Sequence, residues 1–105
     1  MTDKRSPRII IPEIPLSPLP NSDEARSALG FKWASDGVGL SHKLGGEPDW
    51  LQEGTVPTCP SCFATMSFYA QLDSIGDAFT LADCSMVYVF VCFDCFTTSS
   101  ILQSP

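Results

Sequence analysis

Two stretches of sequence decide the fold of this chain: Cys59-Pro-Ser-Cys62-Phe-Ala-Thr-Met-Ser-Phe-Tyr-Ala-Gln-Leu-Asp73 and Ser85-Met-Val-Tyr-Val-Phe-Val-Cys-Phe-Asp-Cys95. Each joins a Cys-x-x-Cys pair to a run of residues that is typical of a β-strand. The two pairs are separated by 29 residues, 63–91. Because an antiparallel pairing of the two strands brings both cysteine pairs to the same end of one sheet, we expect a small β-rich (α+β) domain with an antiparallel sheet.

The spacing of the cysteines predicts a metal site. Four thiolates can surround one zinc ion as a tetrahedron with Zn–S distances of about 2.3 Å, and a two-residue spacer lets one tight turn present both sulfurs. Four protein ligands leave no open position for water or substrate, so such a zinc is structural. The predicted ligands of this zinc-ribbon-like site are Cys59, Cys62, Cys92 and Cys95. Glycine often follows the second cysteine of a knuckle, but this chain has Phe63 and Phe96 there.

A disulfide framework and inert buried thiols are the alternatives to a metal. There are five cysteines, so a disulfide scheme leaves at least one unpaired. The apolar run near the N-terminus is too short for a signal peptide, and no stretch approaches the ~20 apolar residues of a membrane span. We therefore expect a cytoplasmic protein without a membrane segment, where reduced cysteines favour metal binding.

Cys84 is expected to be a buried, inert thiol, because a strand separates it from Cys92.

The strands themselves are expected to differ in burial. Residues 85–92 are apolar on both faces, which is typical of a central strand covered on both sides. Residues 97–102 are expected to return as a further short strand. In residues 65–73, alternation predicts two faces. One face carries Met66, Phe68, Ala70 and Leu72, and the other carries Ser67, Tyr69, Gln71 and Asp73.

The N-terminal part differs in composition from the rest. Five of the nine prolines lie in the first 28 residues, so we divide the chain into an extended Pro-rich arm, residues 1–28, and a zinc-stabilised β-rich domain, residues 29–105. The prolines exclude a helix and a central strand over residues 9–20, and we expect this stretch to lie partly against the domain. Ser22 is a candidate helix cap, with Gly30 as the stop signal.

The loop-rich stretch over residues 31–52 contains a second motif, Lys43-Leu-Gly-Gly-Glu-Pro-Asp-Trp-Leu-Gln52. Gly45 and Gly46 supply backbone angles closed to other residues, or allow a close approach by another strand. Trp50 is expected to dock over the core, with a role in recognition as the alternative. His42 is the single histidine, and a solvated loop position is expected for it.

Charge is distributed unevenly along the chain. Residues 1–43 carry six basic and five acidic groups, a balance of +1, whereas residues 44–105 carry seven acidic groups and no Lys or Arg, a balance of −7. Nucleic-acid binding requires phosphate neutralisation by basic residues, so we expect no nucleic-acid partner. The acidity is explained either by a solvated surface or by electrostatic attraction of a basic protein.

The combination of motifs resembles a known group. The order Leu-Gly-Gly-x-Pro-x-Trp-Leu-Gln (44–52), Cys-x-x-Cys (59–62), Met-x-Phe-x-x-Gln-Leu (66–72), Tyr-x-Phe-x-Cys (88–92) and Cys95 is similar to the YwqG-like family of bacterial proteins. It is also similar to the N-terminal part of the programmed cell death protein 2 family. The resemblance implies a β-rich domain without established catalysis. Some of these relatives are proposed immunity proteins against toxins, and others escort a basic ribosomal protein.

The sequence favours a non-catalytic, zinc-stabilised module that binds a basic protein, as an immunity protein or an escort (chaperone). With one histidine and no carboxylates evidently paired, we expect no enzyme activity. The residues considered for partner binding are Asp73, Asp77, Asp83 and Trp50. A structural zinc domain of a larger assembly is the alternative, and a thiol redox protein is the third hypothesis.

Overall fold

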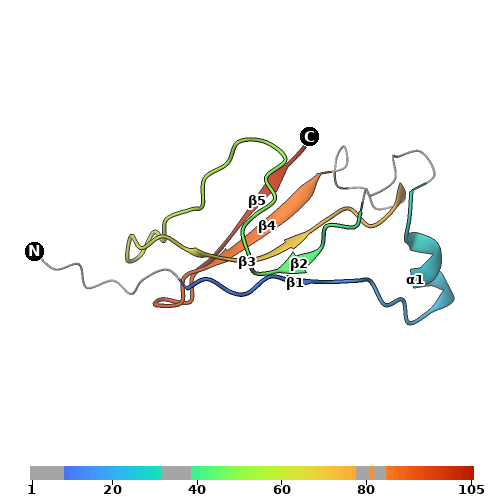
Figure 1. Cartoon of the computed structure of the whole chain (residues 1–105), viewed down its shortest axis with the longest axis horizontal. Coiled ribbons are helices and arrows are strands. Elements are labelled where there is room, and N and C mark those ends of the chain that lie inside the picture. The colour runs from blue at the N-terminus through green and yellow to red at the C-terminus, as the bar shows by residue number, and fades with distance from the viewer. Residues whose placement is uncertain (1–8, 32–38, 78–80, 82–84) are drawn as a thin grey trace, which may run out of the picture.

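The computed structural model describes residues 9–31, 39–77, 81 and 85–105 (Figure 1). They form an antiparallel sheet in the order β1-β2-β3-β4-β5. The elements are β1 (Ile14–Pro15), α1 (Asp23–Ala28), β2 (Lys43–Leu44), β3 (Ser67–Leu72), β4 (Met86–Val91) and β5 (Thr98–Gln103). This is the predicted small β-rich fold, with little helix. Within these described residues, no helix is long and apolar enough to cross a membrane.

Strand β4 lies at the centre of the long part of the sheet, between β3 and β5. Its side chains Met86, Tyr88 and Phe90 are buried on one face. They pack with four more buried residues, which are Cys59, Met66, Phe68 and Cys92. The valines of β4 point to the other face and are only half-buried. The prediction that this strand is covered on both sides was therefore wrong, and one face of the sheet is partly open.

The alternation predicted for β3 fails at Tyr69. Phe68 pairs with Phe90, but Ala70 pairs with Val89, so Tyr69 is an extra residue in a β-bulge. A bulge shifts every later side chain of its strand to the opposite face relative to a regular ladder. As a result Gln71 lies fully buried on the core face, whereas Leu72 is 47% exposed on the open face.

The segment between β2 and β3, residues 45–66, arches over the core face of β4 and β5 (Figure 1). Trp50 anchors it, with its ring centroid 4.7 Å from that of Tyr88 and 6.0 Å from that of Phe90. The Tyr88 hydroxyl donates to Asp49 O at 2.9 Å and accepts from Leu51 N at 3.1 Å. The prediction that Trp50 docks over the core is confirmed.

The arm lies against the sheet by its backbone. Strand β1 pairs with β2 at the edge, and Gly46 N donates to Ile11 O at 2.7 Å. Gly45 has φ +65°, and a Cβ there would lie 2.4 Å from Pro12 O. Both expected roles of glycine, the unusual backbone angle and the close approach, are therefore present at this position. The short strand β2 was not predicted, because only two residues of the glycine-rich stretch pair.

Helix α1 begins after a capping residue and ends before a glycine. The Ser22 hydroxyl accepts from Ala25 N at 3.0 Å, and the helix ends before Gly30, which has φ +94°. Asp23 and Glu24 occupy the first turn, where carboxylates stabilise the helix dipole. The predicted start and stop signals of this helix are confirmed.

Candidate metal centre

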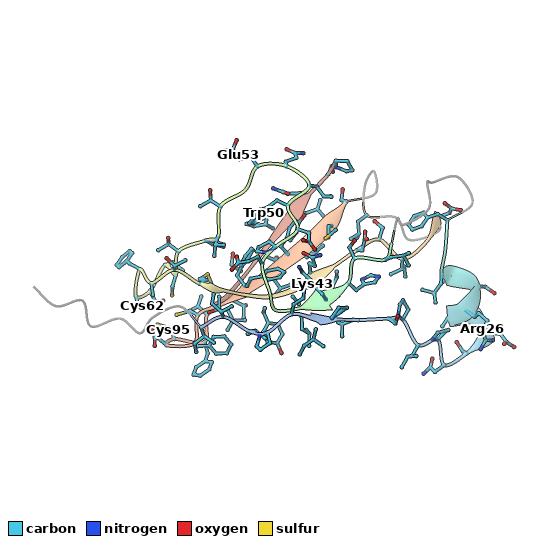
Figure 2. The ribbon with its side chains drawn as sticks, in the orientation of Figure 1. Arg26, Lys43, Trp50, Glu53, Cys62 and Cys95 are labelled. Atoms are coloured by element: carbon cyan, nitrogen blue, oxygen red, sulfur yellow. The ribbon has the colours of Figure 1, made fainter. Side chains whose placement is uncertain are left out.

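The two cysteine knuckles have the same backbone structure. In the first, Cys59 N donates to Ala64 O at 2.8 Å and Phe63 N donates to Cys59 O at 2.9 Å. In the second, Cys92 N donates to Thr97 O at 2.8 Å, and the amide of the residue after Cys95 donates to Cys92 O at 2.7 Å. Each turn is thus closed by the same two hydrogen bonds. The β3–β4 pairing then brings both turns to one end of the sheet, as predicted (Figure 2).

The four sulfur atoms lie within 4.8 Å of one another. A tetrahedron of sulfurs about 2.3 Å from a central ion has edges of about 3.8 Å. The separation of Cys62 Sγ and Cys92 Sγ is 3.6 Å, which matches such an edge and is far longer than a disulfide bond. The described cysteines are free thiols. The donor set and its spacing therefore fit one tetrahedrally coordinated metal ion.

Burial divides the cluster into an inner and an outer pair. Cys59 and Cys92, the first cysteines of the two knuckles, are buried and belong to the apolar core. Cys62 is half-buried and Cys95 is exposed. Loss of Cys59 or Cys92 would therefore disturb both the cysteine cluster and the packing of the core. Cys62 packs against that core from its edge, and Cys95 faces solvent.

The thiols differ in acidity because of their surroundings. The amides of Cys62 and Ser61 donate to the Cys59 thiolate and lower the pKa of Cys59 to about 6, although burial opposes this effect. The hydrogen bond with Cys62, burial and the charges of Cys62 and Cys59 raise the pKa of Cys95 to about 12. Four sulfurs this close cannot all ionise without a compensating cation. A divalent ion held by Cys59, Cys62, Cys92 and Cys95 would supply that charge and would keep all four as thiolates.

Phenylalanines follow the second cysteine of each knuckle, and their backbones are strained. Phe63 has φ +62° and Phe96 has φ +57°, the left-handed region that costs a non-glycine residue roughly 1–2 kcal/mol. Both side chains are largely exposed, at 67% and 73%. The sequence signal was visible as Phe in a position where Gly is common, but we did not include these two residues in the predicted site.

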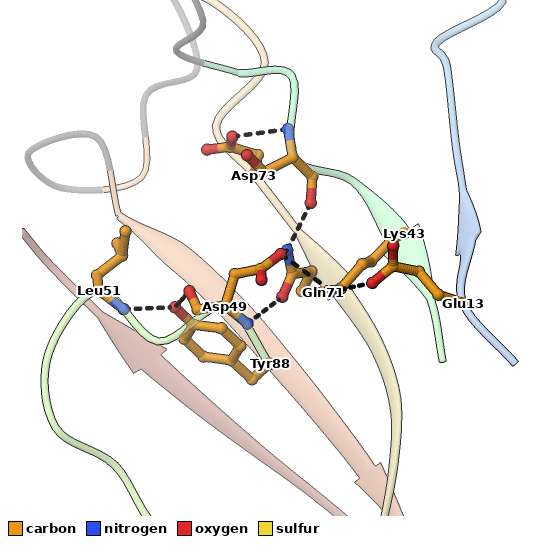
Figure 3. A network of polar contacts seen from close by, with 8 residues as sticks. Glu13, Lys43, Asp49, Leu51, Gln71, Asp73 and Tyr88 are labelled. Atoms are coloured by element: carbon orange, nitrogen blue, oxygen red, sulfur yellow. Dashed lines mark hydrogen bonds and ion pairs between the residues drawn. The ribbon is translucent and has the colours of Figure 1, made fainter. Parts of the chain in front are cut away.

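A second cluster of polar residues lies along β2 and β3, away from the cysteines (Figure 3). The buried Lys43 ammonium contacts Glu13 Oε1 at 2.7 Å and Asp49 Oδ2 at 3.0 Å. Burial lowers the pKa of Lys43, but the hydrogen bonds and charges of Glu13 and Asp49 together raise it by more, so its pKa lies above the ordinary value. Gln71 Nε2 donates to Ser41 O at 2.7 Å and to Asp49 Oδ2 at 2.9 Å.

The structure separates the acidic residues that the sequence grouped for partner binding. Asp73 is 8% exposed, and its carboxylate accepts from Ser41 N and Ser74 N. This carboxylate therefore holds two loop segments and is not a surface charge. Asp77 is exposed. Asp83 and Cys84 lie outside the described residues.

His42 is also more deeply placed than predicted. Its side chain is 8% exposed, and Nδ1 accepts from Asp73 N at 3.0 Å. The expectation of a solvated loop histidine was wrong, because His42 directly precedes β2, and the pairing of β2 with β3 brings its ring to the Asp73 amide.

The fold and the site together define a small antiparallel β domain with a four-cysteine, zinc-ribbon-like cluster. The chain is 41% identical over 61 residues to the uncharacterised protein YpfL of Salmonella typhimurium strain LT2. That match covers 58% of this chain but 14% of the relative. No family model matches the chain, and no solved structure matches it. The resemblance to YwqG-like proteins and to programmed cell death protein 2 therefore stays a prediction.

Proposed function

We propose that this chain is a non-catalytic, zinc-stabilised module that binds a basic protein in the cytoplasm. The metal is assigned as structural Zn²⁺ because four thiolates in a tetrahedron are the preferred donor set of zinc, and no ligand position is left for substrate. Such a site contributes directly to folding, which a domain of this size needs.

The proposed basic partner is inferred from the charge of the described surface. Five of the seven acidic residues in the C-terminal part are exposed, namely Glu47, Asp49, Glu53, Asp77 and Asp94. The basic residues among those described are Arg26 and Lys43, and the Lys43 side chain is 8% exposed and paired with carboxylates. Arg26 lies at the opposite end of the molecule from the cysteines (Figure 2). Such a surface attracts cationic partners and repels phosphate backbones.

Affinity capture followed by kinetics with the purified partner tests this proposal. The zinc-loaded chain is used as bait, captured proteins are identified, and association is measured between ~50 and ~500 mM salt, over which the Debye length falls to a few Å. We expect a basic protein whose association slows strongly with salt. Charge reversal at exposed Asp77 should slow association, whereas Asp73 is too buried to act in this way. An acidic partner, or specific binding of DNA or RNA, would overturn the proposal.

A structural zinc domain within a larger assembly is the second candidate. The observation that favours it is the similarity to YpfL, of which the chain spans 14%. In that case the matched region would bind another part of the same protein rather than a separate partner. Metal analysis after purification without added metal distinguishes both candidates from a thiol redox protein, because a redox dithiol would be isolated without about one zinc per chain.

A further inference from the structure

The two edges of the sheet differ in how they are protected. At one edge, β1 is two residues long and includes Pro15, whereas at the other edge β5 is six residues long (Figure 1). Proteins usually protect an edge strand from further pairing by short length, proline, charged side chains or a bulge. Strand β5, Thr98-Ser-Ser-Ile-Leu-Gln103, contains no proline and no charged residue, and its pairing with β4 has no shift of register. Its outer side is therefore open to another strand.

The hydrogen bond at the start of β5 indicates which backbone groups face outward. Cys92 N donates to Thr97 O at 2.8 Å, so these two opposed residues form a hydrogen-bonded pair. Hydrogen-bonded and non-hydrogen-bonded pairs alternate along an antiparallel ladder, and the β4–β5 register is regular throughout. The N–H and C=O groups of Thr98, Ser100 and Leu102 therefore point away from β4. Among the described residues, no backbone–backbone hydrogen bond reaches these three from another segment.

The geometry of this edge suits a second copy of the chain. The three outward-facing residues are evenly spaced about Ser100, so two antiparallel β5 strands related by a two-fold axis place Ser100 opposite Ser100 of the other copy. The same register places Thr98 opposite Leu102 at both ends. Every outward N–H and C=O group then meets a partner, as a self-complementary interface requires.

The charge of β5 also favours a second copy over the basic partner. Residues 44–105 carry seven carboxylates, but none lies in β5, and the closest in the sequence before it is Asp94, in the second knuckle. Two copies of this acidic chain can therefore pair along β5 without opposed carboxylates in the strands. A basic protein, in contrast, has no carboxylate to contact on this strand.

We propose that β5 pairs with β5 of a second copy in this antiparallel, two-fold symmetric register, so that the two sheets join into one. Each of the outward-facing residue pairs exchanges two backbone hydrogen bonds, and Leu102, which is 52% exposed in the single chain, packs beside Thr98 of the other copy. One strand pair buries less surface than the roughly 1,600 Å² of a standard interface, so we expect a weak dimer that dissociates on dilution. The inference does not depend on the proposed function, because it uses the backbone of an edge and not the acidic surface.

Sedimentation of the zinc-loaded chain under reducing conditions, at concentrations up to about 1 mM, tests the proposal. We expect monomer at low concentration and dimer at high concentration, without larger species, because two-fold pairing closes on itself. Hydrogen exchange of the ¹⁵N-labelled chain then locates the interface. The amides of Thr98, Ser100 and Leu102 should become protected as the dimer forms, whereas β4 should protect those of Ser99 and Ile101 at every concentration. A monomer at all concentrations, or a dimer in which the three outward amides exchange as fast as in the monomer, would overturn the proposal.

Matched variants separate the β5 edge from other contacts. Ser100→Pro removes an N–H that faces away from β4, so it should keep the fold and zinc content but raise the dimer dissociation constant at least about tenfold, through the loss of two symmetric hydrogen bonds. Ser100→Lys places two cations opposite each other and should weaken the dimer without the backbone constraint of proline. Leu72→Ser is the control, because Leu72 is also exposed, at 47%, but lies on β3 away from this edge, and it should leave the dissociation constant unchanged. Unchanged dimerisation in both Ser100 variants, or a loss caused by Leu72→Ser alone, would show that the copies meet elsewhere.

Discussion

The two halves of the sheet are held together by different forces. The half formed by β3, β4 and β5 has six-residue strands, a buried apolar core and the cysteine cluster. The half formed by β1 and β2 has two-residue strands, glycines in contact with backbone, and a polar network around Lys43. Apolar burial thus stabilises the first half, together with the metal that its cysteine cluster would hold, whereas hydrogen bonds and ion pairs of individual side chains position the second half. The two halves should therefore respond to substitution in different ways.

The largest effect is expected at the inner cysteines. Cys92→Ser removes a metal ligand and a member of the core, so it should abolish stoichiometric zinc binding and lower the free energy of unfolding by several kcal/mol, as for other structural zinc sites. Chelator should destabilise the wild type in the same way. Metal analysis and thermal melts measure both effects. Cys84→Ala is the control. The sequence places Cys84 outside the ligand set and predicts an inert thiol, so this variant should retain the zinc and lose roughly 1 kcal/mol. Loss of zinc in it would contradict the predicted ligand set.

The second largest effect is expected at Gly45, where one added methyl group should weaken the attachment of the arm and β1 to the sheet. Gly45→Ala places a Cβ 2.4 Å from Pro12 O at a positive φ, so we expect a loss of about 2–3 kcal/mol and faster proteolysis of the arm. Gly30→Ala is the matched control, because Gly30 also has a positive φ but no atom lies within 4 Å of the added Cβ. Gly30→Ala should lower the free energy of unfolding only by the backbone strain, roughly 1–2 kcal/mol. Equal losses in the two variants would show that the close approach of the arm contributes nothing.

A smaller effect, with a defined pH dependence, is expected at Lys43. Lys43→Met removes the contacts with Glu13 and Asp49 and should lower stability by about 1–2 kcal/mol. Because the folded state raises the pKa of Lys43, its contribution is fully present below about pH 10 and is lost as the pH rises further. The difference between wild type and variant should therefore be constant from neutral pH to about pH 9 and should narrow above pH 10. Urea denaturation across this range measures it, and a difference that widens at alkaline pH would contradict the assignment.

The smallest effect is expected at the Tyr88 hydroxyl, which bonds the 45–66 segment to β4. Tyr88→Phe removes the bond to Asp49 O but leaves the Leu51 amide bonded to Gln103 Oε1 at 3.0 Å. With one unpaired acceptor in a partly exposed loop, we expect a loss of about 1 kcal/mol and unchanged zinc content. Denaturant unfolding and metal analysis check both. Loss of metal would show that the loop and the cysteine cluster are coupled more tightly than these contacts imply.

The parts of the fold that depend on local sequence could be predicted, and those that depend on pairing could not. The knuckles, the apolar strand that ends at Cys92 and the cap at Ser22 each have a signal within a few residues. The bulge at Tyr69 has none, because the alternation of residues 65–73 is the same with or without it. The burial of His42 and Asp73 likewise follows from the pairing of β2, a strand too short to be recognised by periodicity.

The bulge at Tyr69 also has a consequence for how the chain folds. The β3–β4 hairpin has two competing registers beyond Phe68: the bulged one, with Gln71 inside, and a regular one that would bury Leu72 instead. Hydrophobicity alone favours the regular register. Only the bulged register lets Gln71 form hydrogen bonds with Asp49 and Ser41. This register is therefore favoured only after residues 41–49 have packed against the hairpin. We therefore expect the cysteine end of the hairpin to form first and the bulged register beyond Phe68 to be set late in folding.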